Sequence, residues 1–281
     1  MLLSLPDELL ATICTFCAQA TLYSLTFTSR VLGDVASRIL YANVELNGSQ
    51  RVGRFIACLS SGRILPVRYL CIRTMDSPRD LEVLKRCART LTMLYTPANN
   101  VQLQHLVLFK HTNPHRLTHL GLSGYMDPTD VANLLSTPPT TLQHLHIDDF
   151  AVLRRALDVL AHRGTDVTTL APFTSFSCDY FWNPYSEQDR AMELVPGIRG
   201  LLQIQALERV VVFSEASRTS NDSDWQQQLG KLQDPRLYLG FYGCYWSART
   251  PTAWMRDAQR ATGCVQVWVP RSSGKNDRLM A

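Results

Sequence analysis

The segments LTHLGLS at Leu117–Ser123 and LQHLHID at Leu142–Asp148 share one pattern, in which leucines at the first and fourth positions precede an apolar residue at the sixth. The pattern returns at regular intervals along the chain. Further copies lie at Val67–Arg73, Leu91–Pro97, Val167–Phe173 and Leu207–Phe213, with weaker copies at Arg236–Gly240 and Val265–Val269. The copies that start at positions 67, 91, 117, 142 and 167 are separated by 24, 26, 25 and 25 residues. This even spacing predicts a repeat architecture in which each copy is one strand.

Helical patterns fill the intervals between these strands. Apolar residues at helical spacing predict helices near 52–59, 81–87, 101–109, 130–135 and 151–160, and Val44–Leu46 is expected to open the sheet. Two further helices are expected at 225–232 and 254–261. A strand that alternates with a helix at this period predicts an α/β fold with a concave parallel sheet and convex helices.

The repeat length resembles that of leucine-rich repeats, which is about 20–29 residues. The Asn or Cys that usually follows the last leucine of such a repeat is absent here, for example at Gly121–Tyr125 and Asp148–Phe150. We therefore expect an irregular, leucine-rich-repeat-like domain over residues 47–270. A flexible tail is expected at 271–281, where the sequence is polar.

The first 46 residues have a different character. Three short helices are expected there, capped by Ser4, Thr21 and Ser29, and Thr129 is expected to cap the helix near 130–135. Leu9, Leu10, Ile13, Phe16 and Cys17 form one apolar stripe on the first helix. Gly33 lies inside the third helix and lowers its intrinsic stability by about 1 kcal/mol relative to Ala. Because so short a chain buries little surface, these helices need a partner or a neighbouring domain.

The stretch Leu5-Pro6-x-Glu8-Leu9-Leu10-x-x-Ile13, followed by Leu22, Leu25 and Leu40-Tyr41, resembles an F-box. It departs from the usual pattern at Thr21, where an acidic residue is common, and at Tyr41, where Trp is common. The F-box followed by irregular repeats resembles fungal F-box proteins. The resemblance implies an adaptor-binding face, which comprises Leu5, Pro6, Leu9, Leu10, Ile13, Leu22 and Leu25.

The same resemblance implies a function in ubiquitin conjugation. F-box proteins bind a Skp-type adaptor, and through it a cullin, and present a bound protein substrate to the SCF ubiquitin ligase. We therefore expect a substrate-recognition subunit with no catalytic residues and no cofactor. One alternative is a repeat scaffold that works without a ligase, in which residues 1–46 merely cap the open end of the repeats.

Three histidines suggest a functional face on the sheet. His119 and His144 occupy equivalent positions in successive copies, and His146 follows on the same face with Asp148 nearby. The interpretation that we favour is a polar surface that binds the substrate; a metal-dependent enzyme or hydrolase at this face is a second alternative. The substrate-binding candidates on this face are Tyr69, Arg73, Tyr95, His119, His144, His146, Arg209 and Tyr238, and Arg236 is also expected to point outward.

Composition bounds the other possibilities. The formal charge is +4, from 28 Lys and Arg against 24 Asp and Glu, and we interpret it as a mild excess spread along the chain, which argues against nucleic-acid binding. Neither a signal peptide nor a membrane span is expected, so the eight cysteines indicate reduced thiols in a cytoplasmic or nuclear protein.

Motifs of catalysis and metal binding are weak. Cys14 and Cys17 have the spacing of a zinc or redox pair, but both lie on the apolar helix stripe and no second pair follows, which favours packing. No phosphate-binding loop, dinucleotide motif or nucleophile elbow is present.

Overall fold

The protein is an α/β protein built on parallel strands. The computed structural model describes residues 5–46, 48–60, 67–72, 78–97, 116–124, 126–170, 174–180, 187–215, 229–242 and 264–266. The chain divides into two compact units: the first comprises Met1–Tyr125 and Pro139–Leu142, and the second comprises Met126–Pro138 and Gln143–Ala281. The expected boundary at residue 46 therefore does not separate these units. The helices expected at 101–109 and 254–261 and the tail at 271–281 lie outside the described residues.

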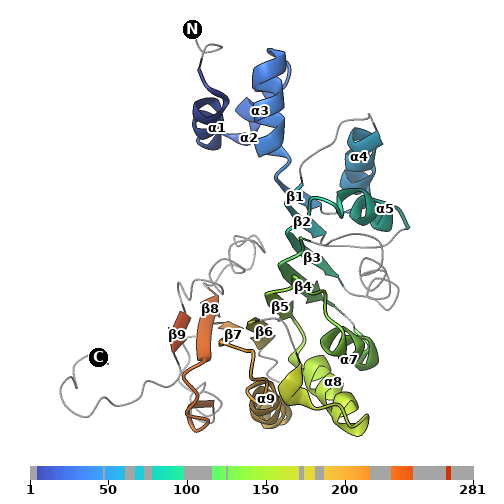
Figure 1. The fold of residues 1–281 in the computed structure, drawn as a ribbon, viewed down its shortest axis with the longest axis vertical. Helices are drawn as coiled ribbons and strands as arrows, with labels where there is room; N and C mark the ends of the chain where they lie inside the picture. The colour runs from blue at the N-terminus through green and yellow to red at the C-terminus, as the bar shows by residue number, and fades with distance from the viewer. Residues whose placement is uncertain are drawn as a thin grey trace, which may run out of the picture. The chain divides into compact units, whose positions relative to one another are not determined.

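The first unit begins with three helices and continues as alternating strands and helices (Figure 1). The helices are α1 (Asp7–Thr15), α2 (Gln19–Leu25), α3 (Arg30–Leu40), α4 (Ser49–Ser60) and α5 (Pro78–Cys87). The strands are β1 (Asn43–Leu46), β2 (Tyr69–Ile72), β3 (Met93–Pro97) and β4 (His119–Ser123). Each strand pairs in parallel with the next, which confirms the strands expected near residues 44, 67, 91 and 117.

The second unit continues the alternation. Its helices are α7 (Pro128–Ser136), α8 (Phe150–His162) and α9 (Glu187–Leu201), with a single 3-10 turn, η2 (Val167–Thr169). Its strands are β5 (His144–Ile147), β6 (Ser175–Tyr180), β7 (Arg209–Glu215), β8 (Leu237–Tyr242) and β9 (Cys264–Gln266). The strands β5 to β8 pair in parallel in chain order, and β9 pairs with β8 in the antiparallel sense.

The strand expected at Val167–Phe173 is wrong. Asp166 accepts hydrogen bonds from the backbone N–H of Thr168 at 2.9 Å and from its hydroxyl at 2.7 Å, and this Asx-type turn starts η2 instead. The strand of this repeat is β6, where Ser175 pairs with His144. Its Ser-Phe-Ser-Cys alternation fits a strand with one apolar face, but it contains no leucine and breaks the even spacing.

Parallel pairing in register puts like residues in rows across the strands of each unit. In the first unit, Val44, Leu70, Leu94 and Leu120 are mutually aligned and buried. In the second unit, the corresponding row contains Leu145, Phe176, Val210 and Leu237, and all four are fully buried. Figure 1 shows α4 and α5 on one side of the strands of the first unit. These rows and the buried faces of the helices form the cores of the two units.

The helix starts agree with the expected caps in one case. Ser29 caps α3 by accepting a hydrogen bond from the backbone N–H of Leu32 at 3.3 Å. By contrast, α7 is capped by Asp127 rather than Thr129, and α2 begins after Ala18, so Thr21 lies inside that helix. Asp127 precedes a proline at the first helical position, a combination that favours a helix start. Ser4 lies outside the described residues.

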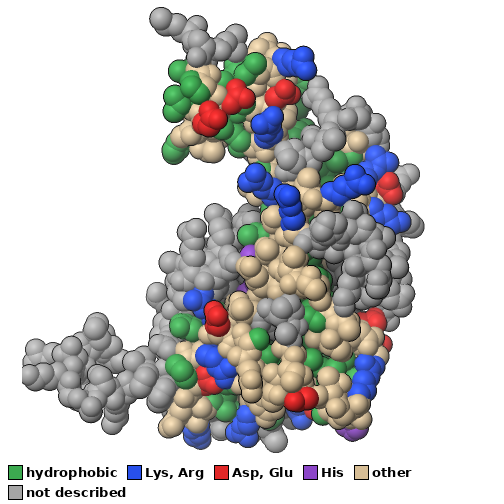
Figure 2. All heavy atoms as spheres, viewed as in Figure 1, with side chains coloured by type: hydrophobic (Ala, Val, Ile, Leu, Met, Phe, Trp, Pro, Cys, Tyr) green, Lys and Arg blue, Asp and Glu red, His purple; other side chains and the backbone are tan. Residues whose placement is uncertain are grey.

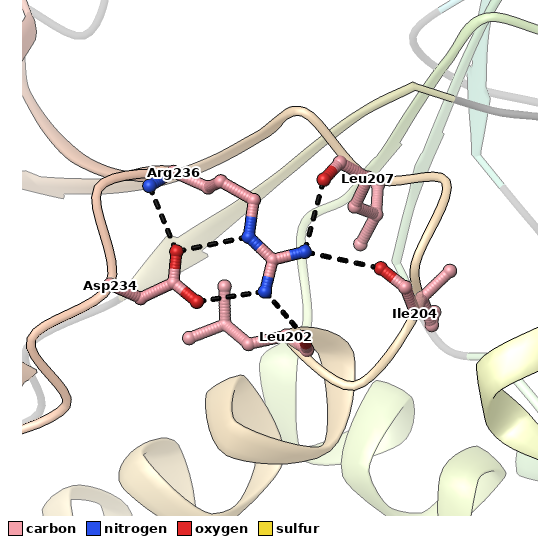
Figure 3. A network of polar contacts seen from close by, with 5 residues as sticks. All are labelled: Leu202, Ile204, Leu207, Asp234 and Arg236. Carbon is pink, nitrogen blue, oxygen red and sulfur yellow. Dashed lines mark hydrogen bonds and ion pairs between the residues drawn. The ribbon is translucent and has the colours of Figure 1, made fainter.

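Arg236 is bound to neighbouring backbone and to Asp234, which corrects the expectation that it points outward (Figure 3). Its guanidinium donates hydrogen bonds to the backbone carbonyls of Leu202, Ile204 and Leu207 at 2.5, 3.2 and 3.1 Å. It also donates to both carboxylate oxygens of Asp234, at 3.0 and 2.7 Å. The side chain therefore satisfies carbonyls that follow the end of α9 and ties them to the start of β8.

The Asp234–Arg236 pair predicts a change in stability with pH. The hydrogen bonds from Arg236 are the main reason that the pKa of Asp234 lies below its ordinary value. A carboxyl whose pKa is lower in the folded than in the unfolded chain stabilises the fold near neutral pH, and this contribution is lost as the pH falls through the folded-state pKa. We expect Asp234→Asn to lower the free energy of unfolding at pH 7 by about 1 kcal/mol or less, because the pair is partly solvated. Urea titrations should find that this difference shrinks as the pH falls below the ordinary Asp pKa of about 4; a constant difference would contradict the role of the ionised carboxylate.

Gly33 predicts a second effect on stability. A Cβ atom at this buried position would lie 2.9 Å from the carbonyl oxygen of Thr26, so the close approach of α3 to the end of α2 needs glycine. We expect Gly33→Ala to lower the free energy of unfolding by about 1–3 kcal/mol, although alanine is the better helix former. Gly53 in α4 is the matched control, because a Cβ there meets no atom within 4 Å. Gly53→Ala should stabilise the protein by about 0.5–1 kcal/mol. Chemical denaturation measures both changes, and equal signs would refute the steric explanation.

Candidate functional site

The N-terminal helices pack around a small core of their own. Leu10, Cys14, Leu22, Val35 and Ala36 are buried together. Partly buried apolar side chains surround this core; they are Leu5, Ala11, Cys17, Leu25, Leu32, Ile39 and Leu40. Helices of 9, 7 and 11 residues bury only this limited set. The remaining apolar side chains of α1 to α3 therefore face solvent.

The exposed side chains form a distinctive surface on these helices. Within the described part of the chain, all exposed large apolar side chains belong to residues 9–31. They are Leu9, Ile13, Phe16, Tyr23, Phe27 and Val31, and we call them the exposed apolar face. Figure 2 shows apolar side chains gathered on this part of the molecule. Surface patches of this kind mark interaction sites in soluble proteins.

Helix geometry explains how the exposed apolar face is built. Leu9, Ile13 and Phe16 are spaced by four and three residues, so they lie on one side of α1. Phe16 is the most exposed of the six, with 87% of its surface accessible. The rings of Tyr23 and Phe27 lie 5.1 Å apart in an edge-to-face arrangement, which holds both aromatic side chains at the surface.

The structure divides the expected adaptor-binding residues into exposed and buried groups. Pro6, Leu9 and Ile13 are exposed, while Leu5 and Leu25 are partly buried. Leu10 and Leu22 are 1% and 5% exposed, which assigns both side chains to the core rather than to the surface. Neighbouring residues on a helix point about 100° apart, and here Leu9 faces outward while Leu10 faces the core. The expected set did not include four members of the exposed apolar face, which are Phe16, Tyr23, Phe27 and Val31. The spacing of Tyr23 and Phe27 by four residues was a visible signal in the sequence.

The substrate-binding candidates of the first unit lie on one face of its sheet. Tyr69 and His119 both align with Met93, and Tyr95 lies in the next row on the same face. Tyr69 and His119 are only 4% and 3% exposed, and Tyr95 is half-buried. The expectation of an open surface at Tyr69 and His119 is therefore corrected, because a partner cannot reach buried side chains. Arg73 lies outside the described residues.

In the second unit, His144 and His146 belong to a buried polar network across β5 and β6. The Nδ1 atom of His144 lies 2.9 Å from the Ser175 hydroxyl, and its Nε2 atom lies 3.0 Å from that of Ser177. The Nδ1 atom of His146 lies 2.9 Å from the Ser177 hydroxyl, and its Nε2 atom lies 2.6 Å from Asp148 Oδ1. Register explains this chain of contacts, because His144 pairs with Ser175 and His146 pairs with Ser177.

The chemistry open to this network is limited by its burial. Ser177, His146 and Asp148 are the residue types of a hydrolytic triad. However, the Ser177 hydroxyl contacts two imidazoles, and Ser177, His144 and His146 are all fully buried. A nucleophile must be accessible to its substrate, so the arrangement fits a link between two strands better than a catalytic centre. The expectation that His144 and His146 form an open binding surface is corrected for the same reason.

Metal binding finds little support in the described positions. No group of three or more His, Cys, Asp or Glu residues in the described part of the chain could hold a metal ion. The pKa of Cys14 is raised, mainly by burial and further by Cys17. Cys14 lies in the core of the N-terminal helices and Cys17 packs against that core, which is the packing role that the sequence favoured.

Arg209 and Tyr238, the last two candidates, meet on the sheet face of the second unit. The guanidinium carbon of Arg209 lies 5.4 Å from the centre of the Tyr238 ring, within the range of a cation–π interaction. Both side chains are half-buried. This pair remains partly accessible, unlike the histidines of β5.

No family model matches the chain, and a search of curated proteins finds no match. The functional assignment therefore rests on the site described above. None of the described helices combines the length and the apolar character that crossing a bilayer requires.

The buried network predicts unequal roles for its two serines. Ser177 contacts both imidazoles, whereas Ser175 contacts only His144. We expect Ser177→Ala to lower the free energy of unfolding by about 1–3 kcal/mol, because two buried nitrogens lose the same oxygen. Ser175→Ala, the matched control, should cost about 1 kcal/mol or less. Urea denaturation compares the two, and an equal or smaller loss for Ser177→Ala would show that the network does not stabilise the fold.

Proposed function

We propose that this chain is a substrate-recognition subunit of an SCF-type ubiquitin ligase. In this proposal residues 1–46 are an F-box that docks on a Skp-type adaptor, and through it on a cullin. Residues 47–270 form an irregular leucine-rich-repeat-like body that holds a protein substrate. Such a subunit works in the cytoplasm or the nucleus, where we place this protein.

The observation that carries the proposal is the exposed apolar face. Large apolar side chains at the surface are unfavourable without a partner, because each exposed leucine or phenylalanine forgoes about 1.5–3 kcal/mol of burial. Here α1 and the segment from α2 to the start of α3 keep six such side chains in solvent. An unfilled surface of this kind on a small helical module is suited to a protein partner.

The resemblance of the N-terminal stretch to an F-box supplies the kind of partner. Pro6, Leu9 and Ile13 of that motif are exposed on or next to α1. Leu10 and Leu22 of the same motif serve the internal core. The motif thus supports the proposal in two ways, since some of its residues fold the module and others remain for the adaptor.

The mechanism in this proposal is proximity rather than chemistry. Binding the adaptor at one end and a substrate on the body raises the local concentration of substrate at the ligase. The short connection from α3 at Leu40 to β1 at Asn43 favours a defined rather than a loosely tethered arrangement.

The proposal predicts that charge on the exposed apolar face abolishes docking. We expect the full-length chain to bind a purified Skp-type adaptor in isothermal titration calorimetry. Leu9→Asp combined with Ile13→Asp should weaken binding by about a hundredfold or more, since central apolar contacts each contribute about 2 kcal/mol.

The matched control carries the same added charge elsewhere. Gln50→Asp combined with Ala57→Asp places two carboxylates at exposed positions of α4, and binding should stay within about twofold of wild type. The proposal fails if the wild-type chain does not bind the adaptor, or if the Leu9 and Ile13 substitutions leave binding intact.

A further inference from the structure

The charge of this protein is concentrated in one part of the chain, which corrects the interpretation of an even spread. Residues 43–125 contain eleven Lys and Arg against four Asp and Glu, a formal charge of +7. Residues 1–42 contain two against three, and residues 126–281 contain fifteen against seventeen. The body of the first unit is therefore strongly basic, while the rest of the chain is slightly acidic.

The fold gathers several of these cations at the edge of the first unit where its strands begin. Arg68 directly precedes β2, and Arg116 lies three residues before β4. Backbone hydrogen bonds fix this edge, with the N–H of Thr92 donating to the carbonyl of Arg68 and the N–H of Thr118 donating to that of Thr92. Consecutive strand starts are thus separated by about 4.8 Å.

The helix α5 brings three further cations to the same edge. Lys85 and Arg86 lie in its last turn, and Arg89 lies in the short connection from α5 to β3. The N–H of Leu91 donates to the carbonyl of Cys87 at 3.1 Å, which closes this connection against the helix end. We call Arg68, Lys85, Arg86, Arg89 and Arg116 the basic edge. Figure 2 shows Lys and Arg side chains gathered over this part of the first unit.

The side chains of the basic edge are open to solvent. All five side chains are exposed. Arg86 Nε pairs with Glu82 Oε1 of the same helix at 2.7 Å. The dipole of α5 accounts for cations in its last turn, but not for Arg68 or Arg116. Like charges held together at a rigid edge repel one another, and a polyanion would relieve that repulsion.

We propose that the basic edge binds an acidic segment of another protein, a run of Asp and Glu residues. Four of its five members are arginines, whose planar guanidinium groups bind carboxylates through paired hydrogen bonds. The edge runs across the starts of β2, β3 and β4, a span of about 10 Å, which matches a few residues of extended peptide. This inference stands independently of adaptor docking.

A nucleic acid fits the same surface less well. Binding of single strands relies on exposed aromatic side chains that stack on bases. In the described part of the chain, the exposed large aromatic residues are Phe16, Tyr23 and Phe27, which belong to the N-terminal helices and not to the basic edge. Duplex binding requires contacts to several phosphates along a longer track.

The test measures binding of a fluorescein-labelled peptide of ten alternating Asp and Glu residues to the full-length chain by fluorescence anisotropy. Arg68→Glu combined with Arg89→Glu should weaken binding by about tenfold or more, and Arg68→Gln with Arg89→Gln should give a smaller loss. The control is Arg51→Glu with Arg54→Glu, which changes the net charge equally at exposed positions in the first half of α4, a helix that starts where β1 ends. The control should stay within about threefold of wild type.

The outcomes separate the possible explanations. An equal loss in both charge-reversal pairs, or no binding by the wild-type chain, overturns the proposal. Tighter binding of a ten-nucleotide single-stranded DNA than of the peptide, lost in the same variant, overturns the choice of partner. Adaptor binding should be unchanged by Arg68→Glu with Arg89→Glu. Failure of peptide binding is therefore distinguishable from failure of the proposed adaptor docking. Circular dichroism of each variant confirms that the comparison is made on folded protein.

Discussion

In-register pairing of parallel strands is the constraint on which the strand ladder of each unit depends. A parallel ladder sets equivalent residues of successive strands side by side, so each side chain on one strand packs against or bonds to those on the neighbouring strands. On one face this aligns Val44, Leu70, Leu94 and Leu120 in an apolar row. On the other it aligns His144 with Ser175 and His146 with Ser177, which makes a hydrogen-bonded chain from side chains far apart in sequence. The same ladder gathers the strand starts, and with them the cations of the basic edge.

The N-terminal helices obey a different constraint, which is their size. Three helices of at most 11 residues cannot enclose all of their apolar side chains. The close approach of α3 to α2 at Gly33 seals a core around Leu10, Leu22 and Val35. Six large apolar side chains are left outside that core. We propose that these six exposed side chains are the functional feature of the N-terminal helices, because a partner would cover them.

The sequence predicted the alternation of strands and helices well where leucine marks the repeats, as in β2 to β5. It failed at Val167–Phe173, because the Asx-type turn at Asp166 depends on one local side chain that periodicity does not register. Burial was harder to foresee. His144 and His146 were expected at an open surface because their polar side chains alternate with apolar ones, yet serine partners on β6 allow both to be buried. On α1, motif resemblance alone could not separate Leu9, which is exposed, from Leu10, which is buried, because that division depends on where α3 packs.

The central claim is that a partner covers the exposed apolar face. Hydroxyl-radical footprinting of the full-length chain, with and without a purified Skp-type adaptor, tests it at the level of single side chains. Our account predicts that Leu9, Ile13, Phe16 and Phe27 react readily in the free chain and are protected in the mixture, while exposed side chains of α4 and α5 are unaffected. Unchanged reactivity of these four side chains in the presence of the adaptor would contradict it.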